Sequence, residues 1–137
     1  MGTNTQATIN GVTLASTVTG PVGMASSQTS RIVSAANSTN ATVAKATGGA
    51  VFRITGQNTN AAARYLKLYD KATAPTVGTD TPVETLPLPA SSPFNFEWSN
   101  GRSFSAGISY ALTTGSADND TGALTAGDVV GLNVDFS

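Results

Sequence analysis

The chain of 137 residues contains no cysteine and no histidine. Without cysteine it has no disulfide, no thiolate nucleophile and no cysteine-based zinc site. Without histidine it lacks the commonest general base near neutral pH and the commonest transition-metal ligand. Because a Ser-His-Asp or Cys-His site cannot be built from this chain alone, we expect a protein that is not an enzyme and uses no cofactor.

Charge is also scarce, at 11% of residues, whereas soluble domains average about 25%. The net charge is −1, and no basic stripe of the kind that neutralises phosphates is present, so we expect no nucleic-acid partner. No apolar run approaches the roughly 20 residues needed to cross a bilayer, so we expect no membrane span. The beginning of the sequence lacks the basic and apolar regions of a signal peptide.

The first 30 residues carry no charged side chain, and Arg31 is the first. Their apolar residues are small in number and isolated. A flexible tail is one interpretation, because so few apolar groups offset little ordering entropy. We favour an extended N-terminal arm, residues 1–30, that becomes ordered against a neighbouring subunit. Its candidate contact residues are Ile9, Val12, Leu14 and Val18.

From residue 31 onward the pattern is one of short strands separated by turn residues. Period-two alternation recurs, and turn signals follow one another at intervals of about 8 to 12 residues, as in all-β sandwiches and barrels. We predict an antiparallel β-sandwich over residues 31–137 with a jelly-roll topology. An immunoglobulin-like sandwich is the alternative, disfavoured because there is no cysteine pair and Trp98 comes late in the strand order.

The segment from Arg64 to Val83 is the most informative part of the chain. Leu66 and Leu68 alternate with Tyr65, Lys67 and Tyr69, which predicts a strand with two leucines facing the core. A Pro- and Gly-rich loop follows, and such a loop on a rigid scaffold is a candidate contact surface. The tyrosine face is either an ordinary solvent face or subunit contact, or a platform that stacks against a glycan. The candidate contact surface consists of Tyr65, Lys67, Tyr69, Pro75, Thr76, Val77 and Gly78.

Aromatic residues at every second position, Phe94, Phe96 and Trp98, predict a strand whose aromatic face belongs to the core. The dipeptide Asn100-Gly101 is a strong hairpin signal and predicts a turn into the next strand, 104–112. Phe52 and Ile54 are predicted to share one face of an earlier strand.

Asp118 and Asp120 are the weak candidates for a metal site. Oxygen ligands at alternate positions suit Ca²⁺, but a full calcium loop needs further ligands, and Asp and Asn are also ordinary turn residues. We therefore expect no metal site here.

Several segments resemble small virion proteins of phages and prophages. They are the run Arg64–Ala72 with Pro75–Pro82, together with Asn37–Lys45, Gly107-Ile108 and Thr121–Asn133. The resemblance covers residues 31–137 and carries no catalytic residue. It implies a virion component assembled in the cytoplasm of the host bacterium. The implied role is head decoration (cement), which stabilises the capsid through self-association and capsid contacts.

The partners implied by the resemblance are the major capsid protein or other virion proteins, with a trimer or dimer of the chain itself. The alternative role is that of a module near the neck, tail or fibre that binds a host-surface glycan.

Overall fold

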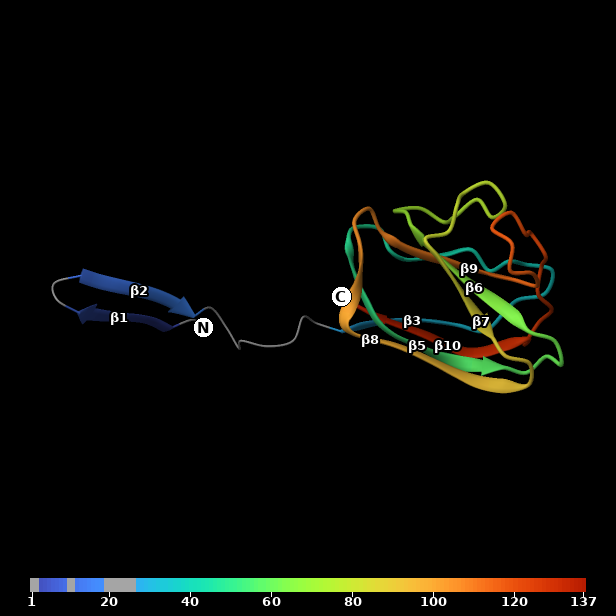
Figure 1. Ribbon diagram of the computed structural model, residues 1–137, viewed down its shortest axis with the longest axis horizontal. Helices are drawn as coiled ribbons and strands as arrows, with labels where there is room; N and C mark the ends of the chain where they lie inside the picture. The colour runs from blue at the N-terminus through green and yellow to red at the C-terminus, as the bar shows by residue number, and fades with distance from the viewer. Residues whose placement is uncertain (1–2, 10–11, 19–26) are drawn as a thin grey trace.

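The computed structural model describes residues 3–9, 12–18 and 27–137. Within these ranges the secondary structure consists of ten strands, and no helix is long and apolar enough to span a membrane. Two of the strands form an N-terminal hairpin, β1 (Thr3–Ile9) and β2 (Val12–Val18), which is a two-stranded sheet of its own. The other eight form two four-stranded sheets that pack face to face (Figure 1).

We refer to the two sheets of the sandwich as sheet I and sheet II. In spatial order, sheet I contains β3 (Gln28–Ile32), β10 (Val129–Phe136), β5 (Gly49–Asn58) and β8 (Ser92–Phe104). Sheet II contains β4 (Thr42–Lys45), β9 (Ile108–Thr113), β6 (Arg64–Asp70) and β7 (Glu84–Leu88). All neighbouring strands are antiparallel.

The strand pairing identifies the sandwich as a jelly roll. The first of its eight strands pairs with the last, β3 with β10, and the same rule continues inward through β4–β9, β5–β8 and β6–β7. A long antiparallel hairpin folded over on itself produces this order, which is the double Greek key of jelly rolls. The predicted fold is therefore confirmed, and the strand order differs from that of an immunoglobulin-like sandwich.

The core lies between the inner faces of the two sheets, where alternate residues of each strand meet. Leu66 and Leu68 of β6 are fully buried, as their alternation predicted, and they lie opposite Leu112 and Tyr110 of β9. Phe94 is buried, while Phe96 and Trp98 are partly buried and pack against this core. The prediction that the aromatic face of this strand contributes to the core is therefore confirmed.

One local prediction about β5 and one about β8 are wrong, and in both strands the cause is a β-bulge. Phe52 has no partner in the register with β10 or with β8, so β5 contains a bulge there. A bulge shifts the alternation by one residue, because it adds a position without adding a pair. Val51 and Ile54 are therefore both buried, whereas Phe52 does not share the face of Ile54 and is partly exposed.

Asn100-Gly101 does not end a strand. It lies within β8, which continues past it to Phe104 and stays paired with β5. Gly101 has a φ of 76°, and a Cβ atom there would lie 3.0 Å from the Phe52 ring. The glycine is therefore used for a bulge that curves the strand and not for a hairpin.

The sandwich begins slightly before the predicted boundary at Arg31. Strand β3 starts at Gln28, which pairs with Phe136 of β10, so sheet I takes in three residues that were assigned to the arm. The rest of the arm contains the hairpin, in which β1 pairs with β2 from Thr3↔Val18 to Ile9↔Val12. Among the described strands, neither β1 nor β2 pairs with a strand of the sandwich.

The edges of the sheets at β7 and β8 carry proline. Pro87 lies in β7 and Pro93 lies in β8, and both strands are edge strands of their sheets. Proline cannot donate to a further strand, so it protects an edge from unwanted pairing. An ion pair of 3.0 Å between Arg102 of β8 and Glu84 of β7 links the two sheets at this edge.

Candidate functional site

The tyrosine face of β6 is covered. Lys67 and Tyr69 have exposed fractions of 0% and 1%, and only Tyr65 is partly exposed. Their cross-strand neighbours on β9 include Ala111 and Ser109, whose small side chains leave room above the sheet. A stacking platform requires accessible rings, so this face of the candidate contact surface is not available to a ligand at Lys67 or Tyr69.

Two loops cover the face, the 71–83 loop between β6 and β7 and the 114–123 loop after β9 (Figure 1). They also touch each other, because a Cβ atom on Gly78 would lie 2.4 Å from the Thr121 methyl carbon. The hydroxyl of Tyr69 is buried beneath them without a hydrogen-bond partner among the described residues. Its burial, followed by the nearby carboxylates of Asp80 and Asp118, raises the pKa of Tyr69.

The ammonium group of Lys67 holds the 114–123 loop on the sheet. Its Nζ donates to the main-chain oxygens of Ala117 at 2.5 Å, Asp120 at 3.2 Å and Asp118 at 3.4 Å. Burial lowers the pKa of Lys67, and the carboxylates of Asp120 and Asp118 act in the opposite direction. Lys67 is therefore a structural cation that satisfies the carbonyls of the loop.

The two aspartates of this loop do not come together as a metal site. Oδ1 of Asp120 accepts hydrogen bonds from the main-chain N–H groups of Gly115, at 3.1 Å, and Gly122, at 2.9 Å. Asp118 is exposed. Among the described residues, no three acidic side chains gather as cation ligands. Asp120 is therefore an ordinary turn residue, which binds main-chain N–H groups of its own loop. The main-chain carbonyls of Ala117, Asp118 and Asp120 already bind the Lys67 ammonium.

The second part of the candidate contact surface, from Pro75 to Gly78, forms a tight turn. Pro75 is buried, Thr76 is exposed, and Val77 and Gly78 are partly exposed. Asp80 fixes the turn by accepting a hydrogen bond from the Thr76 N–H at 2.6 Å and pairing with the Lys71 ammonium. These contacts, that of Lys71 first, lower the pKa of Asp80. The accessible part of this turn is centred on Thr76.

A buried polar cluster ties the sheets together at the start of β10. Asp128 accepts hydrogen bonds from Asn60 Nδ2 at 2.9 Å, Thr125 Oγ1 at 2.6 Å and Arg64 Nε at 2.9 Å. Burial would raise the pKa of Asp128, but the bonds from Thr125, Asn60 and Arg64 outweigh it and lower that pKa to about 2. Both carboxylate oxygens of Asp128 accept hydrogen bonds from other residues of the chain, which indicates a structural cluster.

Asp70 performs a similar task at the other end of β6. Its carboxylate accepts hydrogen bonds from Ser105 Oγ at 2.7 Å and from the N–H groups of Ser105 at 3.1 Å, Ala106 at 2.7 Å and Gly107 at 3.3 Å. These bonds, that of the Ser105 hydroxyl first, lower the pKa of Asp70 to about 2. Asp70 thus fixes the turn between β8 and β9.

We expect the turn held by Asp70 to contribute to acid sensitivity. Since the pKa of Asp70 is lower in the folded chain than the unfolded value of about 3.9, its stabilisation is complete above about pH 4 and is lost as the pH falls towards 2. Asp70→Asn should lower the free energy of unfolding by about 1 kcal/mol at pH 7 and by less at pH 2. Urea denaturation at both pH values measures the difference, and an equal loss at both would contradict this account.

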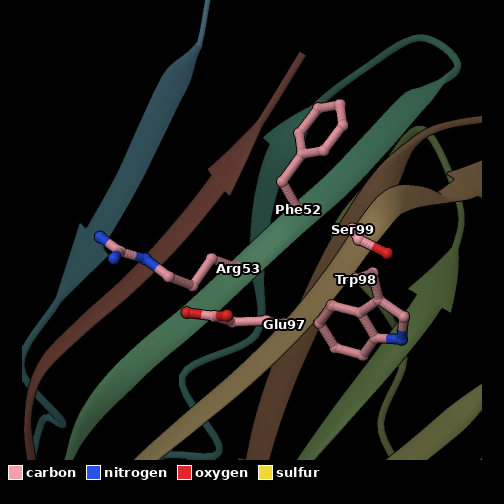
Figure 2. A pocket seen from close by; sticks show the side chains of 5 residues that line it. All are labelled: Phe52, Arg53, Glu97, Trp98 and Ser99. Atoms are coloured by element: carbon pink, nitrogen blue, oxygen red, sulfur yellow. The ribbon is translucent and has the colours of Figure 1, made fainter.

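An open hollow lies on sheet I beside the bulge, lined by Phe52, Arg53, Glu97, Trp98 and Ser99 (Figure 2). Sequence reasoning missed it, because the bulge that brings these residues together depends on the pairing of β5 with β8. A smaller hollow of about 300 Å³ lies at the proline-rich edge of β7 and β8.

The N-terminal hairpin contains the candidate arm residues. Directly opposed residues of antiparallel strands share a face, and the register opposes Ile9 to Val12, Leu14 to Ala7, and Val18 to Thr3. The four candidate arm residues, Ile9, Val12, Leu14 and Val18, are therefore placed on one face of the hairpin. The other face has Asn4, Gln6, Thr8, Thr13, Ala15 and Thr17. The side chains of the hairpin lie outside the described part of the structure.

Comparison with protein-family models, curated proteins and solved structures gave no match to this chain.

Proposed function

We propose that this chain is a structural protein of a phage virion, a head decoration protein that strengthens the capsid through self-association and capsid contacts. The resemblance of residues 31–137 to small phage virion proteins supports the class. The observation that supports the assembly role is the hairpin. Its strands β1 and β2 pair with each other, and their register puts the larger apolar residues on one face. Isolated two-stranded hairpins are marginally stable in water, so a partner surface would stabilise this one.

The composition of the hairpin favours a protein surface as that partner. It contains no charged residue, so docking it requires no desolvation of an ion. Its small residues allow close approach of the main chain to a neighbouring subunit. Around a symmetric shell the same contact repeats at every equivalent position, so a modest contact area per subunit accumulates into a large stabilisation of the particle.

The sandwich suits the same task. Its buried charges, Lys67, Arg64 and Asp128, are all bound to other groups of the chain, and they hold the two sheets and the loops together. A rigid body of this kind presents the Thr76 turn without needing chemistry of its own. The proposed partners are the major capsid protein or neighbouring virion proteins and further copies of this chain, in the virion.

The experiment is to delete residues 1–26, which leaves β3 intact from Gln28. We expect the truncated chain to unfold at nearly the same temperature as the full chain, because neither hairpin strand pairs with the sandwich. We also expect its oligomerisation and its attachment to phage particles lacking the protein to be lost. Light scattering measures the first, and co-sedimentation with the particles measures the second.

A matched pair of substitutions separates the apolar face from the hairpin as such. Leu14→Asp places a charge on the apolar face and should weaken attachment at least about tenfold, whereas Thr13→Asp places the same charge on the opposite face and should leave it unchanged. Equal attachment by the full chain, the truncated chain and Leu14→Asp would refute the proposal.

A further inference from the structure

The hollow on sheet I is created by an unusually large bulge. Glu97 of β8 pairs with Arg53 of β5, and Arg102 pairs with Val51, so residues 98–101 stand opposite Phe52 alone. Four residues facing one force β8 away from its neighbour. The resulting hollow has a volume of about 460 Å³ and is open to solvent. This volume falls within the range of small-molecule sites.

The hollow combines two aromatic rings with a pair of opposite charges. Phe52 and Trp98 are both partly exposed and lie on either side of the bulge, while the side chains of Arg53 and Glu97 extend across the sheet next to each other (Figure 2). Arg53 also pairs with Asp135 at 3.2 Å, and its side chain is 52% exposed. The guanidinium group therefore remains accessible while Asp135 holds it in position.

These groups match the two kinds of surface that a sugar ring presents. The C–H groups of a pyranose form an apolar face, which packs on an aromatic ring. Its hydroxyls are both donors and acceptors, and they need donors such as Arg53 together with acceptors such as Glu97. The Ser99 hydroxyl, at the rim of the hollow, supplies both.

Other classes of ligand fit less well. A phosphate or nucleic acid would be repelled by the carboxylates of Glu97 and Asp135, which outnumber the one guanidinium of Arg53. A purely apolar ligand would displace water from Arg53 and Glu97 and leave without partners those of their polar groups that are not already bound to Asp135 and Asn95. A neutral, polyhydroxylated ligand satisfies all of them.

We infer that the hollow lined by Phe52, Arg53, Glu97, Trp98 and Ser99 is a binding site for a neutral saccharide. The site lies on sheet I, whereas the tyrosine face, for which a glycan platform is one of the alternatives, lies on sheet II beneath two loops. The inference does not depend on the proposed assembly role, because none of the residues that line the hollow belongs to the hairpin on which that role rests.

Trp98 is the only tryptophan of the chain and reports on the site directly. The full chain is titrated separately with glucose, galactose, mannose, rhamnose and N-acetylglucosamine, while the emission of Trp98 is followed. At least one of these probes should shift the emission with saturation. Glu97→Gln and Arg53→Gln, at exposed positions, should each weaken binding by about tenfold with little change in the unfolding temperature.

Tyr65→Phe on sheet II is the matched control and should bind as the unchanged chain does. Leu14→Asp in the hairpin should also bind the saccharide normally, which separates this inference from the assembly proposal. The inference is overturned if none of the probes shifts the Trp98 emission, or if binding is insensitive to both Glu97→Gln and Arg53→Gln.

Discussion

Asp128→Asn is expected to lower the free energy of unfolding by about 3 kcal/mol at pH 7, because the substitution leaves a buried cation without its anion. The side chains of Arg64 and Asp128 are only 12% and 6% exposed, and the two groups are 2.9 Å apart. Thr125 and Asn60 also donate to this carboxylate. Arg64 belongs to β6 of sheet II, and Asp128 directly precedes β10 of sheet I, so the loss acts on both sheets. Chemical denaturation followed by circular dichroism measures it.

Asp135→Asn is the matched control. Asp135 also pairs with an arginine, Arg53, but that arginine is 52% exposed and its ion pair should contribute less than about 1 kcal/mol. If Asp128→Asn lowers the free energy of unfolding by no more than Asp135→Asn does, the buried ion pair contributes no more to stability than the exposed one, and this account is wrong.

The same substitution has a signature in the pH dependence of stability. The pKa of Asp128 is about 2 in the folded chain and about 3.9 when unfolded, so the carboxylate stabilises the fold above about pH 4. The stabilisation decreases as the pH falls from 4 to 2, because the unfolded chain then binds the proton more readily. Asp128→Asn should therefore show a shallower loss of stability over this range than the unchanged chain does.

Lys67→Ala is expected to lower the free energy of unfolding by about 3 kcal/mol and to release the 114–123 loop. The ammonium binds three main-chain oxygens of that loop, and hydrogen bonds to a charged group contribute about 1.5 to 3 kcal/mol. Removal of the buried side chain also leaves a cavity beneath the loops. Hydrogen exchange at residues 114–123 should accelerate, and limited proteolysis should cut there first.

Lys67→Met separates the two contributions, because methionine fills much of the same space without donating a hydrogen bond. It should restore part of the stability but leave the exchange of the loop fast. Lys71→Met, at a partly exposed ion pair with Asp80, should change stability by less than about 1 kcal/mol. Slow exchange of the loop in both Lys67 variants would contradict the structural role assigned to this lysine.

Much of the fold followed from local patterns. The alternation around Leu66 and Leu68 predicted a strand and its buried face, and both leucines are fully buried. The long-range pairing could not be obtained in this way, because period-two alternation says which residues share a face but not which strands are neighbours. The jelly-roll topology was preferred over the alternative on weak compositional grounds, and the pairing of β3 with β10 decides it.

The candidate sites were less predictable than the fold. Lys67 and Tyr69 alternate with core leucines, as residues of a solvent face do, and nothing in the strand itself shows that two loops cover them. The small residues Ser109 and Ala111 on β9 were the available signal, since they leave space for such a cover. The hollow beside Trp98 was not predicted, because it depends on how four residues of β8 are accommodated opposite one residue of β5.

The chain contains two Asn-Gly dipeptides, and comparing them shows that the same local signal can lead to a hairpin or to a bulge, depending on the neighbouring strand. Asn10-Gly11 separates Ile9 from Val12, which are paired, so at this position the dipeptide does mark a hairpin in the sequence. Asn100-Gly101 is the same signal, but there the strand continues as a bulge because β5 runs alongside it as far as Phe104.

The sequence by itself determined the local properties, namely strands, turn-prone positions and the absence of cysteine and histidine, because these depend on side-chain chemistry and near neighbours. Only the tertiary structure decided which faces are covered and where a ligand has access, because both depend on contacts between segments far apart in the chain.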